Sequence, residues 1–294
     1  MSTVVGGVFT SHVPAIGVAI ARGQQATPYW RPFFDGFTPV HQWLAEQKPD
    51  IVVAFYNDHG LNFFLDKMPT FAVGAAASYR HADEGWGLPV ASTFFGIPEL
   101  SWHIIDALVA ADFDVTTCQS MLVDHALAVP FELCWPSAKT WPVRVVPISI
   151  NTVQHPLPHP RRCLALGRAV GRALRAWPGS ERIAVLGTGG LSHQLDGQRA
   201  GFINKDYDRF CMDTLGPDAD ALTRQTPIEI VELAGSQGVE ILNWIAARGA
   251  LGDQVIERTR NYHIPISNTA AATMVLETVS AADQQYAPRV SRVA

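Results

Sequence analysis

Short apolar runs recur along the chain, and each ends in a polar or glycine-containing turn. The clearest of them occupy residues 4–9, 51–56, 143–150 and 183–186. Continuous runs rich in Val and Ile and bounded by turn residues are typical of strands buried on both faces of a sheet. The pattern therefore predicts strands of a largely buried sheet at these four places.

Helical spacing of apolar residues appears between and after these strands. It predicts helices over residues 98–111, 163–177, 238–248 and 270–277. In the first of these, Pro98 stands at the expected start and Leu100, Ile104 and Leu108 share one stripe. Strands alternating with helices predict an α/β fold, a buried mixed sheet flanked by helices. We expect a single domain over residues 1–294, with a possible lobe crossover near 152–161.

Composition narrows the class of protein. The chain has 294 residues, of which 48% are hydrophobic, enough for a large core. The net charge of −5, with scattered Lys and Arg, argues against a nucleic-acid surface. No apolar run approaches the roughly 20 residues that span a bilayer. The start lacks a basic leader, and the four cysteines are far apart and predict buried thiols. We therefore expect a cytoplasmic protein.

Three histidines follow predicted strands by a few residues: His12, His59 and His193. The carboxyl ends of strands in an open α/β sheet are where ligands bind, so these imidazoles could converge. Any one of them alone is more simply a loop histidine bonded to the backbone. Three together favour a metal site or a general base near neutral pH.

The turn before His193 contains Gly187, Gly189 and Gly190. Glycines permit positive φ and close backbone approach, which suits a loop that must direct one side chain into a pocket. A phosphate cradle is the alternative, but the turn lacks the GxxxxGK[ST] pattern.

Glu240 is an isolated carboxylate in an otherwise apolar helical stretch. It is either an exposed first-turn residue favoured by the helix dipole or a buried group that pairs with a cation or metal. Two histidines and one carboxylate make the facial triad of non-haem Fe(II) oxygenases. The spacing does not say which histidine has which role. A Zn-dependent hydrolase with the same ligands, or a non-catalytic binding module, remains open.

The other histidines have simpler interpretations. His125 opens an apolar stretch and by itself is a structural histidine. We treat the remaining six as exposed or structural: His41, His81, His103, His155, His159 and His263. Ser267, Asn268 and Thr269 precede the predicted helix 270–277, where they would cap it or present N–H groups to a substrate carboxylate.

Many of these residues lie in blocks that together resemble a known family. In chain order the blocks are TSHVPAIG, YNDHG, PTFAVG, ADEGWG, VDHALAVP, GTGGLSHQL, RAGFINKDYD, GSQGVEILNW and YHIPISNTA. The chain resembles the class III extradiol dioxygenases, and within them the catalytic β subunit of protocatechuate 4,5-dioxygenase. The similarity runs over nearly the whole chain.

The resemblance implies a non-haem Fe(II) enzyme that cleaves the ring of a catecholic acid such as protocatechuate or gallate, inserting both atoms of O2. It implies His12, His59 and Glu240 as iron ligands, His193 as the catalytic acid–base, and His125 as a group near the oxygen or substrate. It further implies substrate-binding roles for three residues: Asn57 as a residue that shapes the pocket, and Ser267 and Asn268 as contacts to the ring substituent.

Two further expectations come from the resemblance. Such β subunits usually pair with a small helical α subunit that covers the active site, and relatives form oligomers. The family has glycine after the histidine of the VDH motif, whereas this chain has Ala126. The extra methyl group would reshape the pocket and alter the preferred substrate.

Overall fold

A computed structural model describes residues 2–85, 93–264 and 268–279. Among these residues, eight strands form one mixed sheet in the order β10-β11-β1-β9-β2-β8-β3-β6. Their bounds are β1 (Thr3–Thr10), β2 (Ile51–Tyr56), β3 (Phe71–Gly74), β6 (Thr116–Cys118), β8 (Arg144–Ile150), β9 (Arg182–Thr188), β10 (Val255–His263) and β11 (Ala271–Thr278). A smaller sheet contains β4 (Ser78–His81), β5 (Phe94–Phe95) and β7 (Leu122–Val123).

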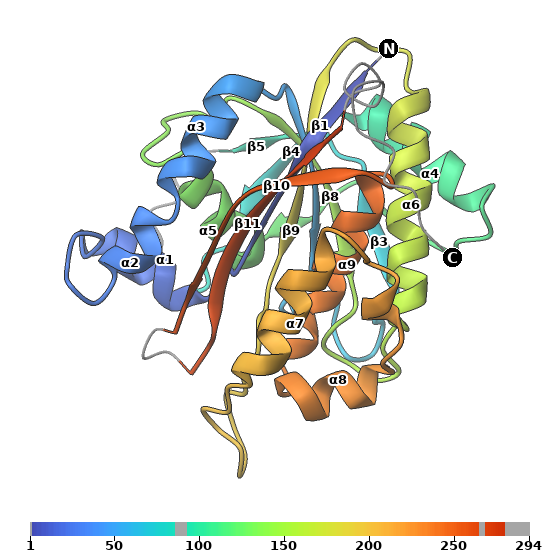
Figure 1. Ribbon diagram of the computed structural model, residues 1–294. Coiled ribbons are helices and arrows are strands. Elements are labelled where there is room, and N and C mark those ends of the chain that lie inside the picture. The colour runs from blue at the N-terminus through green and yellow to red at the C-terminus, as the bar shows by residue number, and fades with distance from the viewer. Residues whose placement is uncertain (1, 86–92, 265–267, 280–294) are drawn as a thin grey trace, which may run out of the picture.

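Helices cover both faces of the large sheet, as Figure 1 shows. On one face lie α4 (Pro98–Val109), α6 (Pro160–Ala176) and α9 (Ile241–Ala250), and on the other α1 (Pro14–Ala21), α3 (Thr38–Gln47) and α5 (His125–Cys134). The remaining helices are α2 (Arg31–Asp35), α7 (Lys205–Leu215), α8 (Pro227–Ala234) and the 3-10 helices η1 (Ala221–Thr223) and η2 (Gly238–Glu240). The α/β class predicted from the sequence is confirmed. None of the helices in the described ranges is long and apolar enough to cross a membrane.

The central strands are buried on both faces because successive side chains point to opposite layers. In β2, Val53 and Phe55 enter the core beneath α4, α6 and α9, while Val52 and Ala54 enter the core beneath α1, α3 and α5. Fully burying an aliphatic or aromatic side chain stabilises the fold by about 1.5–3 kcal/mol. This double burial explains why the four predicted strands have no polar alternation, and all four are confirmed.

The pairing of the strands determines where their ends lie. β1 and β2 both run parallel to β9, with Phe9 and Phe55 each opposite Gly187. The carboxyl ends of these three strands therefore end at the same level of the sheet. On the outer side of β1, β11 runs antiparallel to β1. β10 runs antiparallel to β11 and forms the edge of the sheet.

The predicted helix over residues 270–277 is wrong, because this segment forms strand β11. Its first six residues are buried, as in a strand covered on both faces. Periodicity alone cannot distinguish such a strand from a buried helix, and only the short length favours the strand. Asn268 and Thr269 therefore do not begin a helix. The other three predicted helices are confirmed as α4, α6 and the pair η2–α9.

Candidate metal centre

The carboxyl ends of β1, β2 and β9 present three histidines at one edge of the sheet. His12 and His59 lie just beyond β1 and β2, and His193 lies five residues beyond the end of β9, in the loop that leads to α7. His12 and His193 are 3% and 7% exposed, whereas the side chain of His59 is 27% exposed. The site therefore has a buried floor and one partly open side at His59.

Glu240, the last residue of η2, lies between these imidazoles and is only 5% exposed. Its Oε2 is 3.4 Å from Nε2 of His12, and its Oε1 is 3.6 Å from Nε2 of His59. Oε2 is also 3.8 Å from Nε2 of His193 and accepts a hydrogen bond from the backbone N–H of Gly190 at 2.9 Å. Of the two interpretations of this residue, the structure excludes the exposed first-turn carboxylate.

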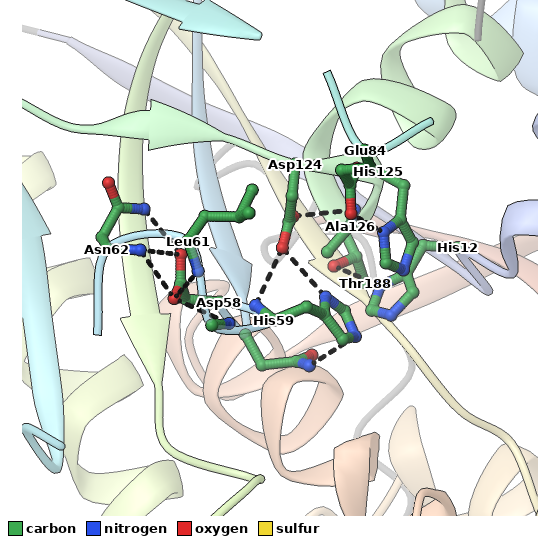
Figure 2. Close-up of polar contacts among 12 residues, drawn as sticks. His12, Asp58, His59, Leu61, Asn62, Glu84, Asp124, His125, Ala126 and Thr188 are labelled. Carbon is green, nitrogen blue, oxygen red and sulfur yellow. Dashed lines mark hydrogen bonds and ion pairs between the residues drawn. The ribbon is translucent and has the colours of Figure 1, made fainter. Parts of the chain in front are cut away.

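Each imidazole at the site has its Nδ1 beside a partner that fixes the ring, and Figure 2 shows most of these contacts. The pairs are His12 with the Thr188 hydroxyl at 3.1 Å, His59 with the Asp124 carboxylate at 2.9 Å, His193 with the Leu191 carbonyl at 2.9 Å, and His125 with the Glu84 carboxylate at 2.8 Å. A ring that donates its Nδ1–H keeps a lone pair on Nε2 when it is neutral. All four rings are therefore oriented to offer Nε2 as a ligand or a base.

The charges of the site favour a bound cation. Burial opposes charge on His59, but the Asp124 and Glu240 carboxylates outweigh it and raise the pKa of His59 to about 10. Burial also opposes charge on Glu240, yet His12 and His59 hold the pKa of its carboxyl well below its usual range. Against its own burial, Asp124 keeps a pKa of about 2 beside His59. With His59 protonated, one of the two buried carboxylate charges stays uncompensated, and a bound cation that takes the place of the His59 proton would compensate it.

The donor atoms also fit a divalent metal in their geometry. Two ligands in adjacent positions, with bonds of about 2.1 Å, lie about 3 Å apart. The distances from Glu240 to His12 and His59, 3.4 and 3.6 Å, are only slightly longer. His12, His59 and His125 also offer nitrogens within 4.8 Å of one another. However, the rings of His59 and His125 are tilted by only 31° at 4.2 Å between centroids, so they lie side by side and do not converge on one ion.

Asn57 lies behind the ligands and is only 1% exposed. Its Nδ2 donates to Oε1 of Glu240 at 3.3 Å and lies 3.1 Å from Nε2 of His59. Its Oδ1 accepts a hydrogen bond from Nδ2 of Asn243 at 2.9 Å, and the same Nδ2 donates to the carbonyl of Thr188. This chain of amides connects the ends of β2 and β9 to α9, so it fixes Glu240 relative to the strand ends.

The loop that carries His59 is held by the preceding residue, Asp58. Its Oδ2 accepts backbone N–H groups from Gly60, Leu61 and Phe63 at 3.0–3.1 Å. Its Oδ1 accepts from Nδ2 of Asn62 at 2.6 Å, and Figure 2 shows Asp58 with Leu61 and Asn62. An Asp that accepts several following amides forms a tight Asx turn. The position of His59 is therefore fixed from both sides, by this turn and by Asp124.

The loop that carries His193 packs closely against Glu240. Gly189 and Gly190 have positive φ, as the sequence predicted for this turn. A Cβ at Gly189 would lie 2.7 Å from Cβ of Glu240, so only glycine fits there. Beyond the turn, the Ser192 N–H and hydroxyl donate to the buried carboxylate of Asp208 at 2.8 and 2.7 Å. These contacts fix the backbone that leads into His193.

Comparison with known proteins agrees with this arrangement. Residues 6–276 match the family described as the catalytic LigB subunit of aromatic ring-opening dioxygenase. The chain belongs to this family. The match includes every described residue of the candidate metal centre.

Relatives of this LigB-family chain include dioxygenases with known names. A gallate dioxygenase of Pseudomonas putida is 36% identical over 67% of the chain and 57% of its own length. Two further relatives are 2,3-dihydroxyphenylpropionate/2,3-dihydroxicinnamic acid 1,2-dioxygenases. That of Paraburkholderia xenovorans is 38% identical over 51% of the chain and 45% of its own length. That of Photorhabdus laumondii is 31% identical over 78% of the chain and 68% of its own length. The chain thus spans about half to two thirds of these relatives.

A solved structure shares the fold. An uncharacterized protein of Escherichia coli K12 has a TM-score of 0.53 and covers 92% of this LigB-family chain, with 99% of that protein aligned. Sequence identity is 14%, so the likeness concerns the fold alone.

Of the two residues predicted to contact the ring substituent, only Asn268 lies in the described part of the chain. Ser267 lies outside the described residues. Asn268 is exposed, with φ +57° and its side chain beside Gly201, and Thr269 is buried and forms a single bridge with His193. Ala126 belongs to α5 and is fully buried in the core that α5 covers, so its methyl group is not exposed to the open side of the site.

Three residues of the LigB-family site were not predicted from the sequence: Asp124, Asn243 and Glu84. Asp124 had a local signal, because an Asp immediately before an apolar helical run is a typical N-cap, and it does cap α5. Asn243 also had one, since it stands three positions after Glu240 and so shares its helical face. Glu84 had none, because its contact with His125 joins segments 41 residues apart.

Proposed function

We propose that this chain is the catalytic part of a non-haem Fe(II) extradiol dioxygenase. Its substrate would be a catecholic aromatic acid such as protocatechuate or gallate, and both atoms of O2 would enter the ring-opened semialdehyde or acid. The observation that carries the proposal is the buried carboxylate of Glu240, which faces Nε2 of His12, His59 and His193. Membership of the LigB family and the named relatives support the reaction class.

In this proposal His12, His59 and Glu240 hold the metal. Two neutral imidazoles and one carboxylate form the facial triad that leaves open positions on non-haem iron. Bound there, Fe(II) would lower the pKa of the catechol hydroxyls as a Lewis acid and provide a position for O2. The amide of Asn57, which donates to Glu240, would hold the carboxylate in its ligating orientation.

His193 is the proposed acid–base. Its Nδ1 is occupied by the Leu191 carbonyl, so Nε2 carries the lone pair that accepts a proton from a substrate hydroxyl. Nε2 lies 3.8 Å from Oε2 of Glu240, close to the proposed metal position. A proton taken there can later be returned when the O–O bond breaks, and both oxygen atoms then stay in the product.

His125 is the second proposed catalytic group. Its ring centroid is 5.4 Å from that of His12 and 4.2 Å from that of His59, so it borders the ligands without joining them. We assign its Nε2 a hydrogen bond to bound oxygen or substrate. Ser267 and Asn268 would contact the ring substituent. The proposal also includes a small helical α subunit, which would cover the partly open side of the site near His59. Residues 1–294 would form one catalytic domain, and the protein would assemble into an oligomer.

The test is anaerobic reconstitution with Fe(II), followed by oxygen uptake on protocatechuate, gallate, a methylated gallate and 2,3-dihydroxyphenylpropionate. The expected result is one O2 consumed for each ring opened, with Fe(II) required and Zn(II) inactive. If iron binds in full and no catechol supports uptake, with or without a co-expressed small subunit, the proposal fails. Ester or amide hydrolysis with Zn(II) would then identify the hydrolase alternative.

Single variants separate the roles. Glu240→Ala should lose iron, whereas His193→Phe should keep iron and lose turnover, because one residue ligates and the other transfers protons. His103→Gln is the matched control, since His103 lies on α4, where its ring bonds the carbonyl of Ala173 and contacts Trp177. Full iron content in Glu240→Ala would contradict the ligand assignment.

A further inference from the structure

Glu84 lies on the connection after β4 and contacts His125 through both of its carboxylate oxygens. Oε2 accepts the backbone N–H of His125 at 2.7 Å, and Oε1 accepts the ring Nδ1–H at 2.8 Å (Figure 2). Both side chains are buried, with 9% and 7% of their surfaces exposed. A carboxylate thus receives two donors from one residue in a region that excludes most water.

This pair of contacts constrains the chemistry of the ring. Two donors aimed at one side chain require two acceptors, and a carboxylate supplies them without a donor of its own. The Nδ1–H tautomer is therefore fixed, and Nε2 is left with its lone pair. A histidine held in one tautomer by a carboxylate is the arrangement that orients the base in hydrolase triads.

The charge of Glu84 has few competing partners. Nε2 of His81 is 3.9 Å from Oε2 of Glu84, and this buried nitrogen has no hydrogen bond among the described residues. Burial lowers the pKa of His81, so this ring is neutral near pH 7. The charged partner of the Glu84 carboxylate is therefore not His81, and both of its oxygens bind His125.

A second metal site on the same residues fits the contacts less well. Glu84, Asp124 and His125 offer three ligand atoms within 4.8 Å. However, both oxygens of Glu84 accept N–H groups of His125, and both oxygens of Asp124 accept N–H groups of His59 or Ala126. An ion would have to displace these hydrogen bonds.

We propose that Glu84 is the positioning residue of His125, which fixes its Nδ1–H tautomer and directs its Nε2 toward the reacting oxygen or substrate. The part of this proposal that concerns turnover rests on the dioxygenase activity proposed above. The part that concerns the tautomer does not depend on any activity.

The direct test is Glu84→Gln, a change of nearly equal shape. A glutamine satisfies the backbone N–H of His125 with its oxygen, and its NH2 group then donates to Nδ1, which moves the ring proton to Nε2. Two-bond 1H–15N NMR of the zinc-loaded, 15N-His-labelled protein at alkaline pH should show Nδ1–H in wild type and Nε2–H in the variant. The His125 signal is assigned by its absence in His125→Gln.

Asp83→Asn is the matched control, because Asp83 carries the same charge one position earlier and only accepts the N–H of Gly85. It should leave the His125 signals unchanged. An Nδ1–H tautomer retained in Glu84→Gln, or a shift of equal size in Asp83→Asn, would overturn the proposal. Melting curves of Glu84→Gln and Glu84→Ala verify that the variants are folded.

Kinetics test the role in turnover. Glu84→Gln should lower kcat by about 10–100-fold, with iron content and the KM for the catechol near wild type. In a His125→Ala background the same change should have no further effect, because Glu84 would act only through His125. An equal loss in both backgrounds, or a loss of iron, would contradict this role. If wild type itself opens no ring, the proposed function fails, while the NMR result still decides the tautomer.

Discussion

At the scale of single residues, the site uses different partners for similar imidazoles. His12 is backed by the Thr188 hydroxyl, whereas His59 is backed by the Asp124 carboxylate. A carboxylate behind a ligating histidine raises its basicity more than a neutral acceptor does. His59 should therefore be the stronger of the two donors, although it is the more exposed.

Gly189 gives a prediction about metal affinity. In Gly189→Ala the new methyl group would lie 2.9 Å from Oε2 of Glu240 and 3.3 Å from Cε1 of His12, so the ligands must separate. We expect metal affinity to fall by about 10–100-fold, measured by metal titration. Gly197→Ala is the control, because Gly197 also has positive φ but its Cβ would meet no atom closer than 3.8 Å. If Gly189→Ala and Gly197→Ala lost metal affinity equally, backbone strain and not contact with the ligands would explain the loss.

Glu132 gives a prediction about pH. Burial raises the pKa of this carboxyl on α5 to about 7. Because the folded pKa lies above the unfolded value, wild type binds an extra proton when folded and loses stability as the pH rises from about 4.5 to 7. Glu132→Gln should match wild type at pH 5 and exceed it by about 2 kcal/mol at pH 8, as measured by urea denaturation. A difference that does not change with pH would contradict this assignment.

The sequence predicted individual site residues where a local rule applied. His12, His59 and His193 follow strand ends, so strand prediction alone brought them to one edge. The alternatives for Glu240 could not be separated, because its burial depends on α9 meeting the ends of β1, β2 and β9. The role of Glu84 depends on a contact 41 residues away, which no local pattern encodes.

At the scale of elements, the ends of strands and helices form the site. The loop after β9, which carries His193, is held in place by hydrogen bonds to other elements. Asp208, on α7, accepts hydrogen bonds from Ser192 N–H, the Ser192 hydroxyl and the Tyr262 hydroxyl. It thereby joins this loop to α7 and to β10. The failed prediction of a helix at 270–277 belongs to this scale too, since β11 becomes a strand only by pairing with β1 and β10.

Asp208→Ala should destabilise the protein by about 2–4 kcal/mol, because two buried donors of Ser192 and the partly buried hydroxyl of Tyr262 lose their acceptor. The matched variant Tyr262→Phe removes one of the three bonds and should cost about 1–2 kcal/mol. Denaturant unfolding measures both, and turnover per bound iron should fall further in Asp208→Ala because His193 follows Ser192. Equal stability of Asp208→Ala and Tyr262→Phe would show that the Ser192 bonds contribute nothing.

At the scale of the whole molecule, the metal centre depends on how closely α9 packs on α6. Gly167 of α6 lies so near α9 that a Cβ there would overlap the carbonyl oxygen of Ala246, and Gly171 is similarly close to Ala250. α9 begins immediately after Glu240, so its position sets the position of this carboxylate. The layer on one face of the sheet and the site at its edge are thus mechanically connected.

Gly167→Ala should therefore affect both stability and metal binding. The methyl group must push α6 from α9, which we expect to cost about 1–3 kcal/mol and to weaken metal affinity because Glu240 moves with α9. Gly216→Ala is the control: Gly216 has negative φ, and its Cβ would meet only Leu276 at 3.7 Å, so its effect should stay within about 0.5 kcal/mol. Unfolding and metal titration of both variants measure the two effects. Lower stability with unchanged metal affinity would show that Glu240 is held by the strand ends and Asn57 alone, independently of α9.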